Sequence, residues 1–264
     1  MLKLSPGGRR YGLIPQKRSH LDFGVARLNL VKATLPAMDN SRFMGPVLDQ
    51  GQQGSCTAHA SAADREFLHW KQIAALGQPV NPGVAGLFSP SFIYYKEREL
   101  DGTLAQGDCG SSGRSSCQVL RKFGCATRVE MPYSDAECSI APTADQLKQA
   151  SQFPTGQYHF LQNVQDMKDC IASGFNFRIG FAVYSSFEDI KSDGVWTADT
   201  SEQLLGYHET LGYGYDDIVN GGSFLVRNSW AKAWGRKGDF YMRYEDAADK
   251  NVLQDAAIQH LGKW

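Results

Sequence analysis

Two kinds of pattern divide this chain, and they constrain its fold more than any other feature. Helical periodicity dominates the first half, where apolar residues recur at helical spacing from Ser55 to about Leu76 and Gly77 ends the run. From Phe175 onward, short apolar segments with strand-like composition alternate with glycines and charged turns. Segregated helices and strands are typical of α+β folds, so we expect two subdomains with a seam between them.

Local signals predict further elements. The Ser-Pro pair at 89–90 begins a helix, because serine caps a helix and proline suits its first turn. Two more helices are predicted over 115–123 and 164–172, the second capped by Asn163 and followed by Gly174. The predicted strands are 175–184, 209–215, 223–228 and 239–244.

The first 34 residues differ from the rest in charge. They carry seven basic residues and one acidic residue, a net +6, whereas residues 35–264 carry 20 basic and 27 acidic residues, a net −7. A basic arm on an acidic body fits nucleic-acid binding, docking onto the protein itself, or a solvated tail. No basic stripe with aromatic residues and no nucleic-acid motif follows, so we expect no nucleic-acid partner.

Composition indicates a globular protein, with 42% hydrophobic and 21% charged residues. The longest charge-free stretch, 72–95, contains three prolines and three glycines, so it predicts a loop and a helix start, and we expect no membrane partner. No signal-peptide pattern opens the sequence, which leaves the cytoplasm and export without a leader as alternatives. We expect a monomer.

Six cysteines lie far apart with no CxxC pair, so we expect no metal and no cofactor, and their disulfide pairing stays open. Cys56 stands in the first turn of the predicted helix, directly after the glycine-rich turn 49–54. Unsatisfied N–H groups and the positive end of the helix dipole stabilise a thiolate there and lower the thiol pKa. A buried cysteine that begins a core helix fits the same position equally well.

A cysteine nucleophile needs a base, and His208 is the best placed of six histidines. His59 lies on the helix of Cys56 but points away from the place where a substrate must sit, whereas His208 opens a strand with glycines close by. Asn228 follows another strand, where its amide oxygen can accept from the ring N–H, and Trp230 can cover that bond. Taken alone, the Asn-Ser pair at 228–229 is an ordinary strand-to-turn transition.

Three segments in this order resemble the papain-like cysteine peptidases. DQGQQGSCTA at 49–58 is similar to the segment around the family's nucleophile, 208–215 to its histidine strand, and NSWAKAWGRKG at 228–238 to its asparagine motif. The LPAMDN segment at 35–40 is more similar to bacterial members than to plant or lysosomal ones. The resemblance covers the chain from about residue 35 to its end.

The resemblance implies a two-lobed α+β fold of the papain type with an active-site cleft between the lobes. Residues 1–34 would be a basic arm like a pro-segment, 35–150 a helical lobe with a long central helix carrying the nucleophile, and 151–264 a β-barrel-like lobe carrying the histidine and asparagine. The implied activity is that of a cysteine endopeptidase, acting on protein or peptide substrates through a thiolate–imidazolium pair and an acyl-enzyme. The arm would act as an intramolecular inhibitor of a zymogen, although it is far shorter than the helical propeptide of lysosomal members.

The resemblance also assigns roles to catalytic residues. Cys56 would be the nucleophile, His208 the general acid and base, and Asn228 the residue that orients the imidazole. The side-chain amide of Gln50 would form the oxyanion hole together with the Cys56 backbone N–H.

Substrate-binding residues follow in the same way. An extended substrate would lie against Gly110 and Ser111, beside Trp230. Ser111, Ala182 and Glu209 would line the main specificity pocket, where the Glu209 carboxylate would favour a basic or polar side chain.

The sequence departs from the family at several positions. Gln53 replaces a cysteine that often forms a disulfide with the neighbouring loop, so the loop containing Cys109 must be held in another way. Thr57 replaces an aromatic residue and Ala231 a glycine. A transglutaminase-like acyl transferase could use the same dyad with an amine acceptor. A catalytically silent peptide-binding homologue would normally lose the cysteine, histidine or glutamine, all of which are present.

Overall fold

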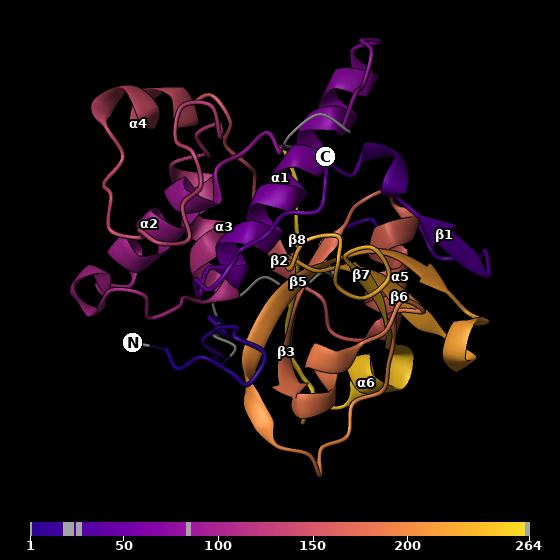
Figure 1. The fold of residues 1–264 in the computed structure, drawn as a ribbon. Coiled ribbons are helices and arrows are strands. Elements are labelled where there is room, and N and C mark those ends of the chain that lie inside the picture. Colours follow the sequence, from indigo (N-terminus) through magenta and orange to yellow (C-terminus); the bar gives the residue numbers. More distant parts are fainter. Residues whose placement is uncertain (1, 18–23, 25–27, 83–85, 262–264) are drawn as a thin grey trace.

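The computed structural model describes residues 2–17, 24, 28–82 and 86–261 (Figure 1). Its helices are α1 (Cys56–Ala75), α2 (Pro90–Leu100), α3 (Gly113–Lys122), α4 (Ala144–Ala150), α5 (Val164–Ala172) and α6 (Tyr244–Ala248). In Figure 1, α2, α3 and α4 gather on one side of α1 and the sheet lies on the other. Because α1 contacts α2 and α3 as well as β3 and β5, it forms the seam between the helices and the sheet.

The strands form one mixed sheet in the order β2-β8-β3-β5-β6-β7-β4, with β1 pairing the far end of β5. They are β1 (Ala37–Asp39), β2 (Tyr158–Phe160), β3 (Phe177–Tyr184), β4 (Val195–Trp196), β5 (Leu204–Asp216), β6 (Ser223–Arg227), β7 (Asp239–Arg243) and β8 (Leu253–Gln259). All pairs are antiparallel except β4 with β7. The expectation of an α+β fold is confirmed. The expected closure of the sheet into a barrel-like lobe is not observed, because β2 and β4 stand at opposite ends of an open sheet and do not pair in the described part of the chain.

The central helix α1 forms where its periodicity predicts it. Its first thirteen residues are nearly all buried, and the small side chains of Ala58 and Ala62 let the helical core pack closely against it. Gly77 follows the helix with φ of +70°, a left-handed conformation that glycine adopts without strain. The Ser55 hydroxyl makes no capping bond and instead contacts His59 Nδ1 at 3.2 Å and the Tyr133 hydroxyl at 3.1 Å.

The two largest hydrophobic cores lie among the helices and within the sheet, and a smaller cluster joins α1 to β5. The helical core packs residues of α1, α2 and α3 around Phe88 and Phe92. The sheet core is rich in aromatic rings, with Phe187 of the 3₁₀ helix η4 (Ser185–Asp189) packed against Trp196, Trp230, Trp234 and Phe240. The remaining 3₁₀ helices are η2 (Ser41–Phe43), η3 (Leu104–Gln106) and η5 (Val219–Gly221).

A buried guanidinium joins the helices to the sheet. Arg178 of β3 donates to Ser61 of α1, to Ser116 and Cys117 of α3, and to Gln259 of β8. Its side chain is 1% exposed. Hydrogen bonds to three other elements make this arginine a fixed connection across the seam.

Some elements differ from the sequence expectation. The helix predicted over 115–123 begins at Gly113, because the Ser112 side chain rather than a later residue accepts the Ser115 N–H. The strand predicted to begin at Glu209 begins at Leu204, which places His208 inside β5. Of the helices described, none is both long and apolar enough to cross a membrane.

Candidate active site

Cys56 is the first residue of α1 and follows a tight loop that is tied to the sheet. Gly51 has φ of +55°, and its N–H donates to Asp49 Oδ1 at 3.0 Å. The Gln50 N–H donates to the Ser229 carbonyl at 2.9 Å, which anchors the loop beside β6. The Cys56 thiol is fully buried, and the backbone N–H groups of Glu209 and Gly12 contact its sulfur. Cys56, the candidate nucleophile, therefore lies next to Glu209, which directly follows His208.

His208 and Asn228 are joined by a short hydrogen bond. His208 Nε2 lies 2.7 Å from Asn228 Oδ1, which also accepts the Ser229 N–H at 2.8 Å. Because Oδ1 is the acceptor, Nε2 carries the proton and Nδ1 is left as the basic nitrogen. Nδ1 is buried with no hydrogen-bond partner among the described residues. The Trp230 ring lies over the imidazole at 5.0 Å, as expected for a cover that excludes water.

Burial determines the charge state of the dyad in this structure. It raises the pKa of the Cys56 thiol to about 12, although the N–H groups of Glu209 and Gly12 oppose that rise. Burial also lowers the pKa of His208 to about 4, with the hydrogen bond to Asn228 acting in the opposite direction. Both groups are thus neutral near pH 7. This differs from the expected thiolate–imidazolium pair, because the site is covered and desolvation outweighs the helix end.

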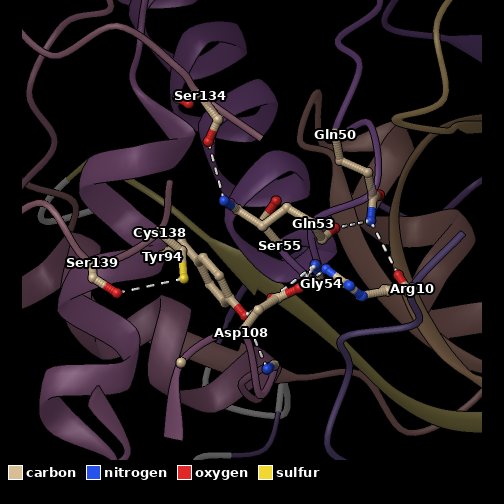
Figure 2. Close-up of polar contacts among 12 residues, drawn as sticks. Arg10, Gln50, Gln53, Gly54, Ser55, Tyr94, Asp108, Ser134, Cys138 and Ser139 are labelled. Atoms are coloured by element: carbon tan, nitrogen blue, oxygen red, sulfur yellow. Dashed lines mark hydrogen bonds and ion pairs between the residues drawn. The ribbon is translucent and has the colours of Figure 1, made fainter. Parts of the chain in front are cut away.

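Gln50 is fixed with its amide nitrogen toward the nucleophile loop. Its Oε1 accepts the Ser229 hydroxyl at 2.7 Å, and its Nε2 donates to the Gln53 carbonyl at 2.9 Å. Nε2 also lies 3.4 Å from the Arg10 carbonyl oxygen (Figure 2). An oxyanion hole requires an N–H group that can donate to the carbonyl oxygen of a substrate, and Gln50 Nε2 is placed to do so.

Asp108 holds the loop 49–54 that precedes Cys56, in which Gln53 stands at the place of a cysteine that could form a disulfide. The Gly54 N–H donates to Asp108 Oδ1 at 3.0 Å, and the Tyr94 hydroxyl donates to the same oxygen at 2.6 Å (Figure 2). The Gly110 N–H in turn donates to the Tyr94 oxygen at 2.9 Å. All six cysteines are free thiols. Sequence reasoning missed Asp108 and Tyr94; the signal was an acidic residue directly before Cys109, on the loop expected to need another support.

The N-terminal arm passes directly over this site. The Gly12 carbonyl accepts the Ser111 N–H at 2.9 Å, and the Ile14 N–H donates to the Ser111 carbonyl at 2.7 Å. The Leu13 N–H donates to the Tyr207 carbonyl at 3.2 Å. A Cβ atom at Gly12 would lie 1.7 Å from the Gly54 carbonyl oxygen, so the arm approaches the loop as closely as only glycine allows.

Side chains of the arm fill the surroundings of the dyad. The Tyr11 ring is 6% exposed and lies edge-on to His208 at 6.0 Å, with its hydroxyl 2.6 Å from Glu188 Oε1. The Arg9 guanidinium lies over the Trp230 ring at 5.2 Å. Leu13 is 4% exposed and lies beside β3, where a Cβ atom at Gly180 would be 2.7 Å from its Cδ2.

The structure brings only part of the expected substrate pocket together. Gly110 and Ser111 border the arm as expected, but the Ser111 hydroxyl turns to Asp101 Oδ2 at 2.7 Å. Ala182 lies in the sheet core at 1% exposure. The Glu209 carboxylate is 1% exposed and lies 3.8 Å from Arg178, so in this structure it faces an internal cation and not an open pocket. That position corrects the expectation that Glu209 is available for a substrate's basic side chain.

No cluster of histidine, cysteine and acidic residues suited to a metal ion occurs in the part of the chain that the structure describes. The mutual arrangement of a buried thiol, an imidazole oriented by an amide, and an inward-facing glutamine amide is suited to acyl transfer from a carbonyl compound.

Comparison with known proteins agrees with this chemistry. A family model described as papain family cysteine protease matches residues 35–260. Among solved structures, xylellain, a cysteine protease from Xylella fastidiosa, is 29% identical and superposes with a TM-score of 0.82 over 96% of each chain. The bromelain protease from Ananas comosus, solved in complex with the E64 inhibitor, is 18% identical with a TM-score of 0.66 and shares the fold.

Curated relatives show the same likeness. An uncharacterized peptidase C1-like protein, L477, of Acanthamoeba polyphaga mimivirus is 30% identical over 79% of this chain. A cysteine proteinase of Theileria parva is 25% identical over 83% of this chain. The matched regions span 67% and 45% of those two proteins. The likeness to xylellain is consistent with the resemblance to bacterial members that the sequence indicated.

Proposed function

The chain belongs to the papain family of cysteine proteases, and we propose that it is an endopeptidase that works through an acyl-enzyme on Cys56 and is held inactive by its own N-terminal arm. The observation that carries the catalytic part is the orientation of His208. The Nε2–H of His208 donates to Asn228, so the basic Nδ1 has no hydrogen-bond partner among the described residues. The next residue of the strand, Glu209, contacts the Cys56 sulfur through its backbone N–H.

The reaction follows from these groups. His208 Nδ1 takes the thiol proton, and the Cys56 sulfur attacks the peptide carbonyl carbon to form a C–S bond. Gln50 Nε2 and the Cys56 N–H stabilise the negative oxygen, and the imidazolium then protonates the leaving amine as the C–N bond breaks. Water, deprotonated by His208, splits the thioester and restores the free thiol. Asn228 keeps the ring in one orientation throughout.

The position of the arm supports a zymogen. The Gly12 N–H contacts the Cys56 sulfur. Because this part of the arm occupies the space beside the sulfur, the docked arm blocks the nucleophile. Departure of the arm would return water to the site, remove the desolvation that keeps the dyad neutral, and allow the thiolate–imidazolium pair to form.

Charge and apolar burial both hold the arm in place. Arg9 lies 3.4 Å from Asp49 and Arg10 lies 3.0 Å from Asp108, which fits the expectation that the basic arm docks on an acidic body. Tyr11 and Leu13 are buried beside the dyad and β3. Salt screens the charged contacts but not the apolar ones, so high salt alone should release only part of the inhibition.

Tyr11→Ala in the full chain should raise the rate of peptide hydrolysis about thirtyfold. The change removes a buried ring and its hydrogen bond to Glu188, which together stabilise the docked arm by about 2 kcal/mol. Initial rates with a fluorogenic peptide measure the effect. Leu4→Ala is the matched control, because Leu4 is also apolar and in the arm but is 48% exposed. Equal rates for Tyr11→Ala and the unaltered chain would rule out inhibition by the arm.

Two measurements on the Tyr11→Ala chain test the catalytic proposal. An epoxide inhibitor of cysteine proteases should label Cys56, and the other five cysteines serve as internal controls for general thiol reactivity. Peptide cleavage with and without an added primary amine then separates hydrolysis from acyl transfer. A peptidase yields mainly the free acid. A dominant amide product would assign a transferase instead, and label at another cysteine with hydrolysis intact would remove Cys56 as nucleophile.

A further inference from the structure

Tyr133 lies outside the dyad and holds the backbone of the proposed oxyanion donor. Its hydroxyl donates to the Gln50 carbonyl oxygen at 2.8 Å. The next residue, Ser134, accepts at its carbonyl oxygen from Gln53 Nε2 at 3.1 Å (Figure 2). Residues 133 and 134 therefore contact the loop 49–54 near both of its ends.

The direction of each hydrogen bond around Tyr133 follows from the atoms that can only accept. The Gln50 carbonyl oxygen carries no proton, so the Tyr133 hydroxyl gives it its single proton, and the Ser55 hydroxyl, at 3.1 Å, donates to the Tyr133 oxygen. His59 Nδ1 lies 2.9 Å from the Ser55 carbonyl oxygen, so Nδ1 carries the ring proton. Burial lowers the pKa of His59 to about 4, which leaves the ring neutral near pH 7 with one proton. The donors thus run in one direction, from His59 through Ser55 and Tyr133 to Gln50.

The two proposed oxyanion donors depend on Tyr133 to different degrees. Cys56 is the first residue of α1, and the Ser55 carbonyl before it accepts the His59 N–H at 3.0 Å, so the helix itself fixes the Cys56 N–H. Gln50 lies outside the helix. The orientation of its peptide group therefore depends on hydrogen bonds from other segments, and the bond from the Tyr133 hydroxyl is one of them.

From this arrangement we propose that Tyr133 is a positioning residue for the oxyanion hole, because its hydroxyl holds the Gln50 backbone so that Gln50 Nε2 is aimed at the carbonyl oxygen of the substrate. The inference rests on the proposed function and adds to it a residue that acts through Gln50. A donor stabilises the developing negative charge only when it is already aimed at the place where that charge forms. A rotated Gln50 would therefore weaken the transition state more than the bound substrate.

Tyr133→Phe should lower kcat about tenfold and change the apparent KM by less than about threefold. The ring remains, with its edge-on contact to His59 at 4.6 Å, and only the hydroxyl is lost. The measurement uses a fluorogenic peptide at saturating concentration and the full chain carrying Tyr11→Ala, because saturating substrate displaces the arm and kcat then reports the chemical steps. Tyr215→Phe is the matched control: its hydroxyl also bonds a backbone carbonyl, at 3.1 Å, but toward the far end of β5 from His208, so kcat should not change.

A double-mutant cycle with Gln50→Ala separates positioning from general support of the loop. Gln50→Ala alone should lower kcat about a hundredfold, the effect typical of removing one oxyanion donor. Once that amide is gone, Tyr133 has no donor to aim, so adding Tyr133→Phe should lower kcat by less than about twofold. A tyrosine that only stabilised the fold would lower kcat by the same factor in both chains. Thermal unfolding checks that every variant is folded.

The outcomes distinguish this inference from the proposed function. A kcat for Tyr133→Phe within about twofold of its parent, a loss that appears in KM instead, or an equal loss with and without Gln50→Ala overturns the role of Tyr133 while peptide hydrolysis stands. An unchanged kcat for Gln50→Ala removes the donor and the role of Tyr133 with it. A lack of hydrolysis by the Tyr11→Ala parent overturns the proposed function, and this inference falls with it.

Discussion

Cys56→Ala is expected to lower the rate of peptide hydrolysis about a millionfold, to the level that binding and oxyanion stabilisation alone sustain. The change removes the sulfur that forms the acyl-enzyme, and no other described thiol lies at the start of α1 beside His208. The loss of one buried sulfur atom should leave the fold intact. Hydrolysis by the Tyr11→Ala chain with and without Cys56→Ala measures the effect, and circular dichroism checks the fold.

Cys125→Ala is the matched control for this prediction. Cys125 is also fully buried, but its thiol contacts the backbone carbonyls of Ser89 and Ala126 in the helical core, away from the dyad. The control should lose some stability and keep its activity. If Cys56→Ala retained more than about a thousandth of the rate, a nucleophile other than Cys56 would have to carry the reaction.

Arg178→Met is expected to lower the free energy of unfolding by about 3–5 kcal/mol at pH 8, the cost typical of removing one partner of a buried ion pair. The guanidinium connects α1, α3 and β8 and lowers the pKa of two buried carboxyls, Asp64 and Glu209. Without it, Glu209 loses the cation beside its carboxylate, and Asp64 keeps only the attraction of Arg65 and Lys71. Urea unfolding of both chains measures the difference.

The same variant should show a distinct pH dependence. Burial raises the folded-state pKa of Glu209 to about 8 and that of Asp64 to about 7, above the values of both groups in the unfolded chain. The folded state therefore binds more protons, and stability falls as pH rises from about 4 through these values. Loss of Arg178 raises both folded-state pKa values further, so the destabilisation should be smaller at pH 5.5 than at pH 8.

Arg121→Met provides the control for charge and shape. Arg121 lies on the exposed face of α3, so its replacement should change stability by less than about 0.5 kcal/mol at either pH. A loss of under about 1 kcal/mol for Arg178→Met would show that the buried guanidinium does not hold the seam. An equal loss at both pH values would show that its effect does not act through the charges of Asp64 and Glu209.

The sequence predicted the elements whose signals are local. The helix carrying Cys56 was identified because a glycine turn, a regular apolar spacing and a terminal Gly77 coincide within one segment. The hydrogen bond between His208 and Asn228 was anticipated from strand ends and from the resemblance, and the two side chains do meet. Whether these residues catalyse, together with the boundaries at 34 and 150, stays a prediction for the experiments above.

Other elements depend on contacts that a single sequence does not display. Helix α4 was missed because only Ala150 of its residues is buried, so it has no apolar stripe and just the capping box of Thr143 and Gln146 marks it. Strand β8 contains an aspartate, two glutamines and two alanines beside a single β-branched residue, Ile258, and pairing with β2 and β3 makes it a strand. Arg178 was visible as a lone charge in an apolar run, but its partners lie on distant segments.

The arm and the nucleophile are parts of one chain, which has a consequence for how the protein can be switched on. A ligand joined to its receptor by a flexible tether meets it at an effective concentration on the order of millimolar, whatever the concentration of the molecule. Dilution on secretion or in an assay therefore leaves latency unchanged, and a free peptide competes with an occupant that cannot diffuse away. Activation has to come from cutting the tether or from a change that lifts residues 9–14 from Ser111 and Cys56 together.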